Sequence, residues 1–179
     1  PELVQITESE IDWDILTAVT KEAVTNALEQ LNAMRTIEGQ RLAQDLVLKM
    51  DRIAQLVEEI ESYAPQVVIN YRTRLQERLD ELLSGTSLPL ERFEAEVALF
   101  ADRCSIDEEL VRLGSHIEQF LETLKQRGPV GRKLDFLIQE MNREINTIGS
   151  KANDLHITKA VVELKSELEK VREQVQNLE

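Results

Sequence analysis

Hydrophobic residues recur every three or four positions along most of the chain, which is the spacing of one face of an α-helix. The pattern predicts a first helix over residues 12–62, because no proline and only Gly39 interrupts it. Thr7 and Glu10 form a candidate capping box just before it. The apolar face of this helix is made by Leu42, Leu46, Met50, Ile53, Val57 and Ile60.

Pro65 is predicted to end the first helix, since proline lacks the backbone N–H that a helix interior requires. Gly85 is the candidate stop of a second helix, whose apolar stripe is made by Val68, Tyr71, Leu75, Leu79 and Leu82. The short connection at residues 62–64 then predicts that the two helices fold back on each other as an antiparallel hairpin.

Two shorter helices are predicted next. Pro89 is a candidate start for the third, which directs inward Phe93, Val97 and Phe100 or Ala101. Ser105 and Glu108 form a second candidate capping box, which would open the fourth helix. That helix would stop at Gly128-Pro129 and bury Leu110, Leu113, Ile117, Phe120 or Leu121, and Leu124.

The last two helices have the clearest patterns. The fifth would end at Gly149 and bury Leu134, Leu137, Ile138, Met141, Ile145 and Ile148. The sixth has the strict 4-3 alternation typical of a coiled-coil seam, in Val161, Leu164, Leu168, Val171, Val175 and Leu178. With no strand pattern, the predicted fold class is all-α: a long antiparallel helical hairpin arm over residues 1–90, followed by a compact helical bundle over residues 91–179.

The composition agrees with a helical protein and argues against a membrane-spanning, secreted or disulfide-bonded one. Among 179 residues there are only 6 glycines and 4 prolines, and no apolar run approaches the roughly 18 residues of a membrane span. The amino-terminal residues lack the pattern of a signal peptide. The single cysteine, Cys104, excludes an intrachain disulfide, fits a reducing cytosol and is expected to be a small buried residue rather than a nucleophile. A first residue that is Pro1 rather than Met suggests a fragment of a longer protein.

The charge is strongly acidic but unevenly distributed. The formal net charge is −13, made of −7 in residues 1–60, −5 in residues 61–127 and −1 in residues 128–179. Net charge alone argues against a nucleic-acid binder. A nucleic-acid path, if present, is therefore expected in the last third or along a local row of arginines.

Polar rows flank the apolar face of the helix predicted over residues 131–148. One row holds Asp135, Gln139, Asn142 and Asn146. The other holds Lys133, Glu140 and Glu144, while Phe136 and Arg143 point away from the core. Two interpretations stay open, a seam that bonds a neighbouring helix or a surface that binds phosphates and a metal.

Two further clusters also have two interpretations each. Glu109, Arg112 and His116 share one helix face. Either they form a simple ion pair bonded to a histidine, or they serve as metal ligands and a general base. Arg74 and Arg78 lie one turn apart near Tyr71. Either this is a solvated helix face, or the arginines contact the phosphates of a nucleic acid while Tyr71 stacks on a base. The chain has no P-loop, GxSxG, HExxH or CxxC motif.

Four segments together resemble one known family: MRTIEGQRLAQDL (34–46), EVALFADRCSIDEELVRLGSHIEQF (96–120), GRKLDFLIQEMNREINTIGSK (131–151) and EKVREQVQNLE (169–179). They are similar to the carboxyl-terminal portion of the bacterial YicC/YloC family of stress-associated endoribonucleases. The resemblance runs from about residue 30 to the last residue. Ser105 departs from it, since the family more often has Asp there, and the family's amino-terminal α/β domain is absent from this sequence.

The resemblance implies a cytoplasmic endoribonuclease, dependent on Mn²⁺ or Mg²⁺, that cleaves single-stranded or structured RNA, including small regulatory RNAs. It also implies a homo-oligomer such as a hexamer, with no membrane and no small-molecule cofactor. Candidate catalytic residues are then Glu109, His116 and Asp135. Candidate metal ligands are Glu109, His116, Asp135, Glu140 and Glu144. Candidate phosphate contacts are Arg112, Arg132, Lys133, Arg143, Lys151 and Arg172.

Two other function classes fit the same residues. The net charge and the lack of a recognised acid–base spacing favour a non-enzymatic adaptor that brings RNA or a nuclease partner together. The heptad pattern of the last helix is also compatible with a coiled-coil scaffold that has no RNA role. Metal-dependent turnover separates the enzyme from the adaptor, and RNA binding at low salt separates the adaptor from the scaffold.

Overall fold

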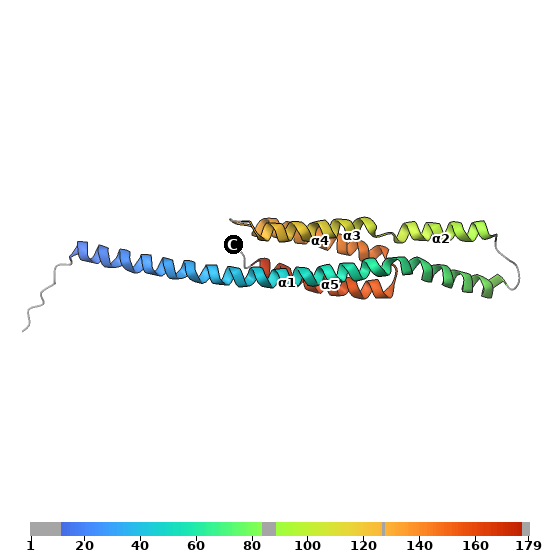
Figure 1. Cartoon of the computed structure of the whole chain (residues 1–179), viewed down its shortest axis with the longest axis horizontal. Coiled ribbons are helices and arrows are strands. Elements are labelled where there is room, and N and C mark those ends of the chain that lie inside the picture. The colour runs from blue at the N-terminus through green and yellow to red at the C-terminus, as the bar shows by residue number, and fades with distance from the viewer. Residues whose placement is uncertain (1–11, 84–88, 127, 177–179) are drawn as a thin grey trace, which may run out of the picture. The chain divides into compact units, whose positions relative to one another are not determined.

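The computed structural model describes residues 12–83, 89–126 and 128–176. Helices make up nearly all of these residues, with no strand among them, which confirms the all-α fold class (Figure 1). The helices are α1 (Trp13–Leu83), α2 (Leu90–Cys104), α3 (Asp107–Leu124), α4 (Gly131–Lys151) and α5 (Leu155–Val175). Within this described part, no helix has the length and apolar content needed to cross a membrane.

The chain forms two compact units, Pro1–Arg41 and Leu42–Glu179. In the first unit, α1 begins after Asp12, whose carboxylate accepts hydrogen bonds from the backbone N–H groups of Asp14 and Ile15. The capping box predicted at Thr7 and Glu10 lies outside the described residues. Nearly every side chain of this unit's helix is exposed, so its apolar residues contribute little to a core.

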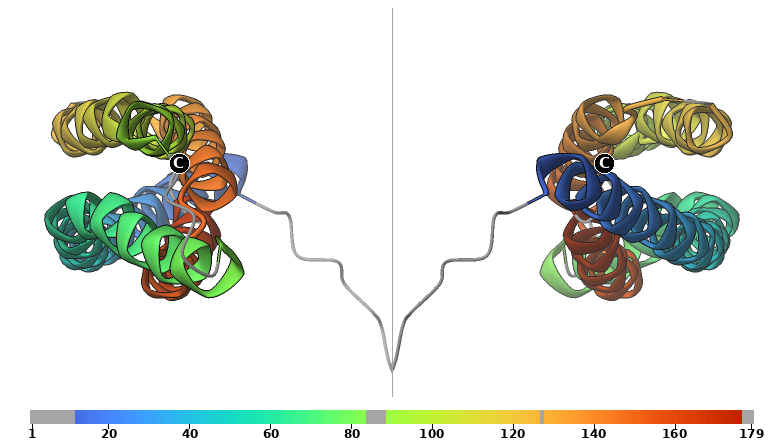
Figure 2. Two further views of the ribbon diagram at one scale, coloured as in Figure 1. Left: turned by 90° about the vertical axis from the view of Figure 1, so that its right-hand side faces the viewer. Right: turned by 90° about the vertical axis from the view of Figure 1, so that its left-hand side faces the viewer.

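The second unit holds the hydrophobic core. Residues 42–83 of α1 pack with α3, α4 and α5 around one apolar cluster, and successive helices of this set run antiparallel (Figures 1 and 2). All six predicted core residues of α4 are buried, as are the predicted seam residues of α5 up to Val175, whereas Leu178 lies outside the described residues. Amphipathic periodicity therefore placed the inner faces of α4 and α5 correctly.

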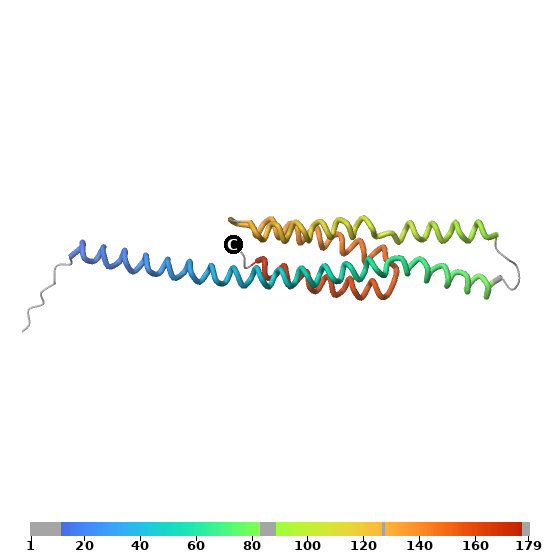
Figure 3. The backbone as a smooth tube through the Cα atoms, viewed as in Figure 1, coloured from blue at the N-terminus to red at the C-terminus, as the bar shows by residue number. Residues whose placement is uncertain are grey.

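The turn predicted at residues 62–64 is wrong, because α1 continues as a helix through Pro65 to Leu83 (Figure 3). Proline removes one helix hydrogen bond, at a cost of about 3 kcal/mol relative to alanine. Ile60 and Val67 are both buried in the same core on either side of it. The burial of these side chains offsets the local cost, so the helix continues where sequence alone predicted a stop.

The antiparallel neighbour of the end of α1 is instead α2. The rings of Tyr71 and Phe100 stack with their centroids 3.6 Å apart, and Arg72 forms an ion pair with Glu94. The reversal between the two helices falls within residues 84–88, which include Gly85 and lie outside the described residues. Because Tyr71 is occupied by Phe100, it is not a free platform for a base. Of the stripe predicted here, Leu82 is exposed.

The capping box predicted at Ser105 and Glu108 is also wrong. Ile106 is the N-cap residue of α3, and its side chain makes no capping hydrogen bond. Glu108 instead accepts a 2.7 Å bond from Arg112, one turn along the helix. The buried side chain of Ile106 positions this end of α3 by packing rather than by capping.

Gly149 lies inside α4 and does not end it. A Cβ atom at this position would lie 3.0 Å from Cγ1 of Val161 on α5. The lack of a side chain therefore permits the close packing of α4 against α5. The chain turns four residues later, where Asn153 adopts a positive φ of 43°. Asp154 then caps α5 by accepting hydrogen bonds from the N–H groups of His156 and Ile157.

Candidate functional site

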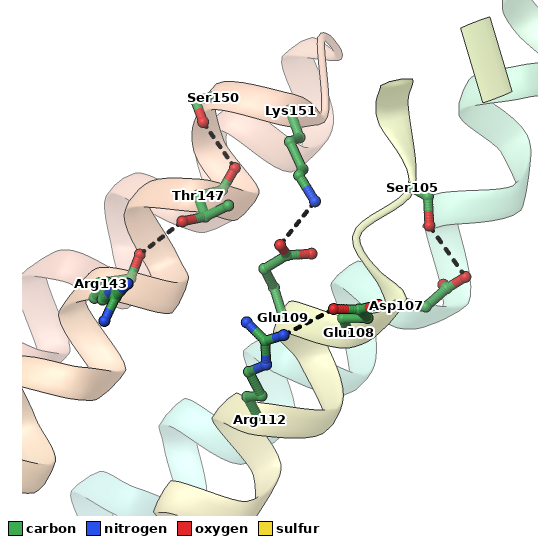
Figure 4. A network of polar contacts seen from close by, with 9 residues as sticks. All are labelled: Ser105, Asp107, Glu108, Glu109, Arg112, Arg143, Thr147, Ser150 and Lys151. Atoms are coloured by element: carbon green, nitrogen blue, oxygen red, sulfur yellow. Dashed lines mark hydrogen bonds and ion pairs between the residues drawn. The ribbon is translucent and has the colours of Figure 1, made fainter. Parts of the chain in front are cut away.

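A buried ion pair joins the start of α3 to the end of α4. Lys151 Nζ donates a 2.7 Å hydrogen bond to Glu109 Oε1 (Figure 4). Glu109 is only 5% exposed, and its second oxygen, Oε2, is buried with no hydrogen-bond partner among the described residues. A buried carboxylate with one free oxygen is an unusual feature in a helical core, because burying an unsatisfied polar atom costs free energy.

Two opposing effects act on the pKa of Glu109. Burial raises the pKa, while the Lys151 hydrogen bond, the residue's own backbone N–H, and the positive charges of Lys151 and Arg112 lower it. The net effect holds the pKa of Glu109 below its ordinary value. The carboxylate is therefore charged at neutral pH and depends on its cationic neighbours.

One arginine lies close to this ion pair. Arg112, on α3, donates its hydrogen bond to Glu108, so the predicted Glu109–Arg112 pairing is present only as a charge interaction. Arg143, on α4, is highly exposed, lies 3.8 Å from Glu140 and is about 12 Å along the helix from Lys151. Figure 4 shows Lys151 and Arg112 on either side of Glu109 and Arg143 farther along α4. The buried acid is thus bordered by Lys151 and Arg112.

His116 and Glu144 continue the same seam. The helices are antiparallel, and His116 follows Glu109 by seven residues just as Glu144 precedes Lys151 by seven. This register places them at the same level of the seam, about 10 Å along the helices from the ion pair. Glu144 is 6% exposed, and the Nδ1 atom of His116 is buried without a partner among the described residues. The imidazole of His116 therefore retains unused hydrogen-bonding capacity.

The remaining predicted residues lie elsewhere on these helices. Asp135, just past the first turn of α4, accepts a 2.8 Å bond from Gln139, and its Cα lies about 24 Å along the axis from that of Lys151. Arg132 and Lys133 are exposed in the first turn. Arg172, on α5, is exposed and lies 3.7 Å from Glu169. The structure thus brings Glu109 and Lys151 into contact and does not bring Asp135 to them.

The seam does not assemble a multidentate metal site within one chain. Across the described ranges, no group of three or more Asp, Glu, His or Cys side chains lies close enough to hold a metal ion. Carboxylate and imidazole donors suit Mn²⁺ or Mg²⁺ in type, but their number at any one place is too small.

Cys104 lies beside α3 and fits its predicted structural role. It is half-buried against the core, and burial raises the pKa of its thiol, which the nearby charge of Arg103 lowers less. The thiolate that a nucleophile requires is therefore disfavoured.

The fold and the seam together define an all-helical protein with a buried acid–lysine pair and Arg112 beside it. The family Endoribonuclease YicC-like, C-terminal, matches residues 60–179, so the chain belongs to this family, as its sequence motifs predicted. It is 51% identical over 180 residues to "Probable endoribonuclease YicC" of Clostridioides difficile strain 630. It is 39% identical over 182 residues to the protein of the same name in Haemophilus influenzae. Each comparison covers 100% of this chain, which spans 61% of the length of either relative.

Proposed function

We propose that this chain carries the helical part of an endoribonuclease whose site lies along the α3–α4 seam. The observation that carries the proposal is the buried Glu109–Lys151 pair, with the charge of Arg112 beside it, in a chain whose relatives are named as probable endoribonucleases. The proposed substrates are single-stranded or structured RNAs, including small regulatory RNAs, in a stress-associated cytoplasmic role. The division into an arm (1–90) and a C-terminal bundle (91–179) is part of the same proposal.

The seam has the groups that phosphodiester cleavage requires. Lys151, Arg112 and Arg143 are placed to hold a phosphate and to offset the negative charge that develops on its oxygens. His116, whose Nδ1 is unpartnered, is the candidate general base, and Glu144 is placed to orient it. Glu109 holds Lys151 in position.

A divalent cation, Mn²⁺ or Mg²⁺, is part of the proposal through the family. When bound, it would lower the pKa of a water molecule and polarise a phosphoryl oxygen. In this chain His116 and Glu109 each offer a buried atom without a partner among the described residues, and Glu144 lies at the level of His116 in the seam, while Glu140 and Asp135 already contact Arg143 and Gln139. Because no three such groups converge in the described ranges, the substrate or a second subunit would have to complete the coordination.

The test is cleavage of end-labelled structured RNA with Mn²⁺, Mg²⁺ or EDTA in parallel. We expect internal cuts that EDTA abolishes, and a loss of at least about 100-fold in rate in Glu144→Gln and in His116→Ala. Glu118→Gln is the matched control, because it removes the same charge from an exposed position on α3. The full-length Clostridioides difficile relative serves as the reference for intact enzyme. If both variants cut as fast as the unaltered chain while folded, the seam is not the active site.

A second candidate function is that of a non-enzymatic RNA-binding adaptor. The lack of three converging metal ligands in the described part of the chain favours it. In the same assay an adaptor would bind RNA at low salt and give no cuts with any metal, also when the full-length relative is used.

Self-association is the third element of the proposal. In the first unit, α1 exposes apolar side chains that are three, four or eight residues apart: Trp13, Leu16, Val24, Leu28, Leu31 and Met34, each 46–68% exposed. An unpartnered apolar stripe of this kind is typical of a helix that packs against another helix. A second copy of the chain is the proposed partner.

We expect sedimentation to show an oligomer that Leu28→Glu with Leu31→Glu dissociates, because each carboxylate would have to be buried in the contact. Asn26→Glu is the control, since by helical geometry Asn26 lies on the opposite side of the helix from these two leucines. A monomeric unaltered chain, or an oligomer that resists the double substitution, would contradict this assignment.

A further inference from the structure

The side of α4 that faces away from the core has an unusual composition. At 100° per residue, six side chains lie within a narrow band opposite the buried stripe, and all six are exposed: Arg132, Phe136, Gln139, Arg143, Asn146 and Ser150. This band, called here the outer face of α4, contains two arginines and no carboxylate. The chain as a whole has 34 acidic and 21 basic residues, so a six-residue face without an acid departs from its composition.

Phe136 is the most informative residue of this face. Aromatic residues make up 4% of the chain, and the four phenylalanines include Phe93, Phe100 and Phe120, which are all buried. Phe136 is 58% exposed and is not part of the apolar core. A single exposed apolar residue is common on protein surfaces. Here the exposed ring has an arginine one helical turn before it and another two turns after it.

Carboxylate side chains lie along both edges of the outer face but not on the face itself. Asp135 is bonded to Gln139, which leaves the amide oxygen of Gln139 free to accept. Glu140 lies 3.8 Å from Arg143, a long and highly exposed contact that a phosphate can replace at little cost. Arg132 has no acidic neighbour in the first turn of α4, where the helix N-terminus also favours an anion.

We propose that the outer face of α4 binds single-stranded RNA, with one base stacked on Phe136 and phosphates held by Arg132 and Arg143. This inference rests on the proposed function, in that RNA is taken as the substrate, and it assigns Phe136 as a positioning residue for it. Arginine and phenylalanine are the side chains on which unpaired bases and their phosphates are commonly held. The arginines lie about 6 Å and about 10 Å along the axis from Phe136, so a strand laid along the helix reaches all three.

Single-stranded RNA is favoured over a duplex for a physical reason. In a duplex, each base is covered by its neighbours in the stack, and its flat surface is not available to a side chain. A ring that stands out from a helix can stack only on a base that is unpaired and free to turn outward. Arg143 lies on this face about 12 Å along α4 from Lys151, so a strand held on the outer face and continued along the helix would lead towards the seam.

Binding measured in EDTA tests the inference independently of cleavage. A short fluorescent oligoadenylate is titrated with the unaltered chain and with Phe136→Leu, which keeps an apolar side chain but removes the aromatic ring. We expect Phe136→Leu to bind about tenfold more weakly, with the salt dependence of binding unchanged. Phe136→Trp should bind as tightly as the unaltered chain. In the Trp13→Phe background its single indole should lose fluorescence as the oligonucleotide is added.

The arginines should behave differently from the ring. Arg132→Gln and Arg143→Gln should each lower the slope of log affinity against log salt by about 0.7, the value for one phosphate contact on a single strand. Arg92→Gln on α2, also exposed, is the matched control and should change neither quantity. Circular dichroism of each variant confirms that it is folded.

Three outcomes would overturn the inference: Phe136→Leu binding as tightly as the unaltered chain, a duplex of the same length binding equally well, or no binding at low salt. The failure of the proposed nuclease function is a separate result. If the chain never cuts RNA but Phe136→Leu weakens binding tenfold, the binding face stands and the nuclease does not. If the chain cuts RNA and Phe136→Leu binds normally, the reverse holds.

Discussion

Replacing Lys151 by methionine is expected to lower the free energy of unfolding by about 3 kcal/mol at neutral pH, because it leaves the Glu109 carboxylate buried without its partner. This is the low end of the range for breaking a buried ion pair. Lys151 is itself 39% exposed, so water reaches the site and reduces the loss. Urea unfolding followed by circular dichroism measures the difference.

The pH dependence of this effect has a definite sign. In the unaltered chain the folded pKa of Glu109 is lowered, so the pair contributes stability above the unfolded pKa of about 4.3 and loses it as the pH falls through the folded value. Without Lys151, burial dominates and the folded pKa rises above the unfolded one. Protonation then favours the folded state of the variant, and its deficit should shrink as the pH is lowered towards 4.

The double variant Glu109→Gln with Lys151→Met provides the control. It removes both charges, so it should be more stable than Lys151→Met alone. In this pH window, position 109 should then make no pH-dependent contribution to its free energy of unfolding. Glu81→Gln is a matched surface control, because Glu81 forms a pair with Arg78 on α1 in which both side chains are 70% exposed, and it should change stability by less than about 1 kcal/mol. Equal stability of Lys151→Met and the unaltered chain at neutral pH would show that the pair contributes nothing.

Replacing Pro65 by alanine is expected to raise the free energy of unfolding by about 2 kcal/mol. An alanine N–H at this position can donate to the carbonyl of Glu61 and complete the hydrogen-bond ladder of α1, which is worth about 3 kcal/mol in a helix interior. Proline also restricts the unfolded chain, and losing that restriction lowers the free energy of unfolding by up to about 1 kcal/mol. Pro65 is exposed, so no core contact is lost.

The neighbouring substitution Gln66→Ala shows whether the gain is specific to proline. Gln66 is also exposed, and its replacement should change stability by no more than about 0.5 kcal/mol. A Pro65→Ala variant that is less stable than the unaltered chain would mean that α1 requires the kink or the missing hydrogen bond at this point.

The parts of the fold that the sequence predicted well are those that depend on one repeated property. In α4 and α5 every predicted inward residue that the structure describes is buried, because a helix with one apolar stripe has a single way to face a core. The predicted helix at Pro89 and its inward residues Phe93, Val97 and Phe100 are correct for the same reason.

The errors concern places where a local signal competes with packing. Proline at position 65 and glycine at position 149 are both common helix ends, yet each lies inside a helix. At Pro65 the buried Ile60 and Val67 pack into the same core on either side of the proline, and at Gly149 the nearby Val161 leaves little room for a side chain. Sequence reasoning weighs a breaker by its usual effect and cannot see the neighbour that offsets it.

The candidate site was predicted as a set of residues but not as an arrangement. Glu109 and Lys151 were both singled out, but as a carboxylate ligand and a phosphate contact, whereas they bind each other across 42 positions of the chain. Phe136 was seen to point outward, without a role. The contrast between its exposure and the burial of the other phenylalanines became visible only with the fold.

The sequence by itself determined that this protein is helical, which faces of its later helices are apolar, and to which family it belongs, because periodicity and motif are properties of neighbouring residues. Only the tertiary structure decided where the chain reverses, which acid receives Lys151, and that the predicted metal ligands do not converge in the described part of one chain. These depend on the register between helices that are distant in sequence. That register is set by how whole apolar faces pack together, and no local pattern records it.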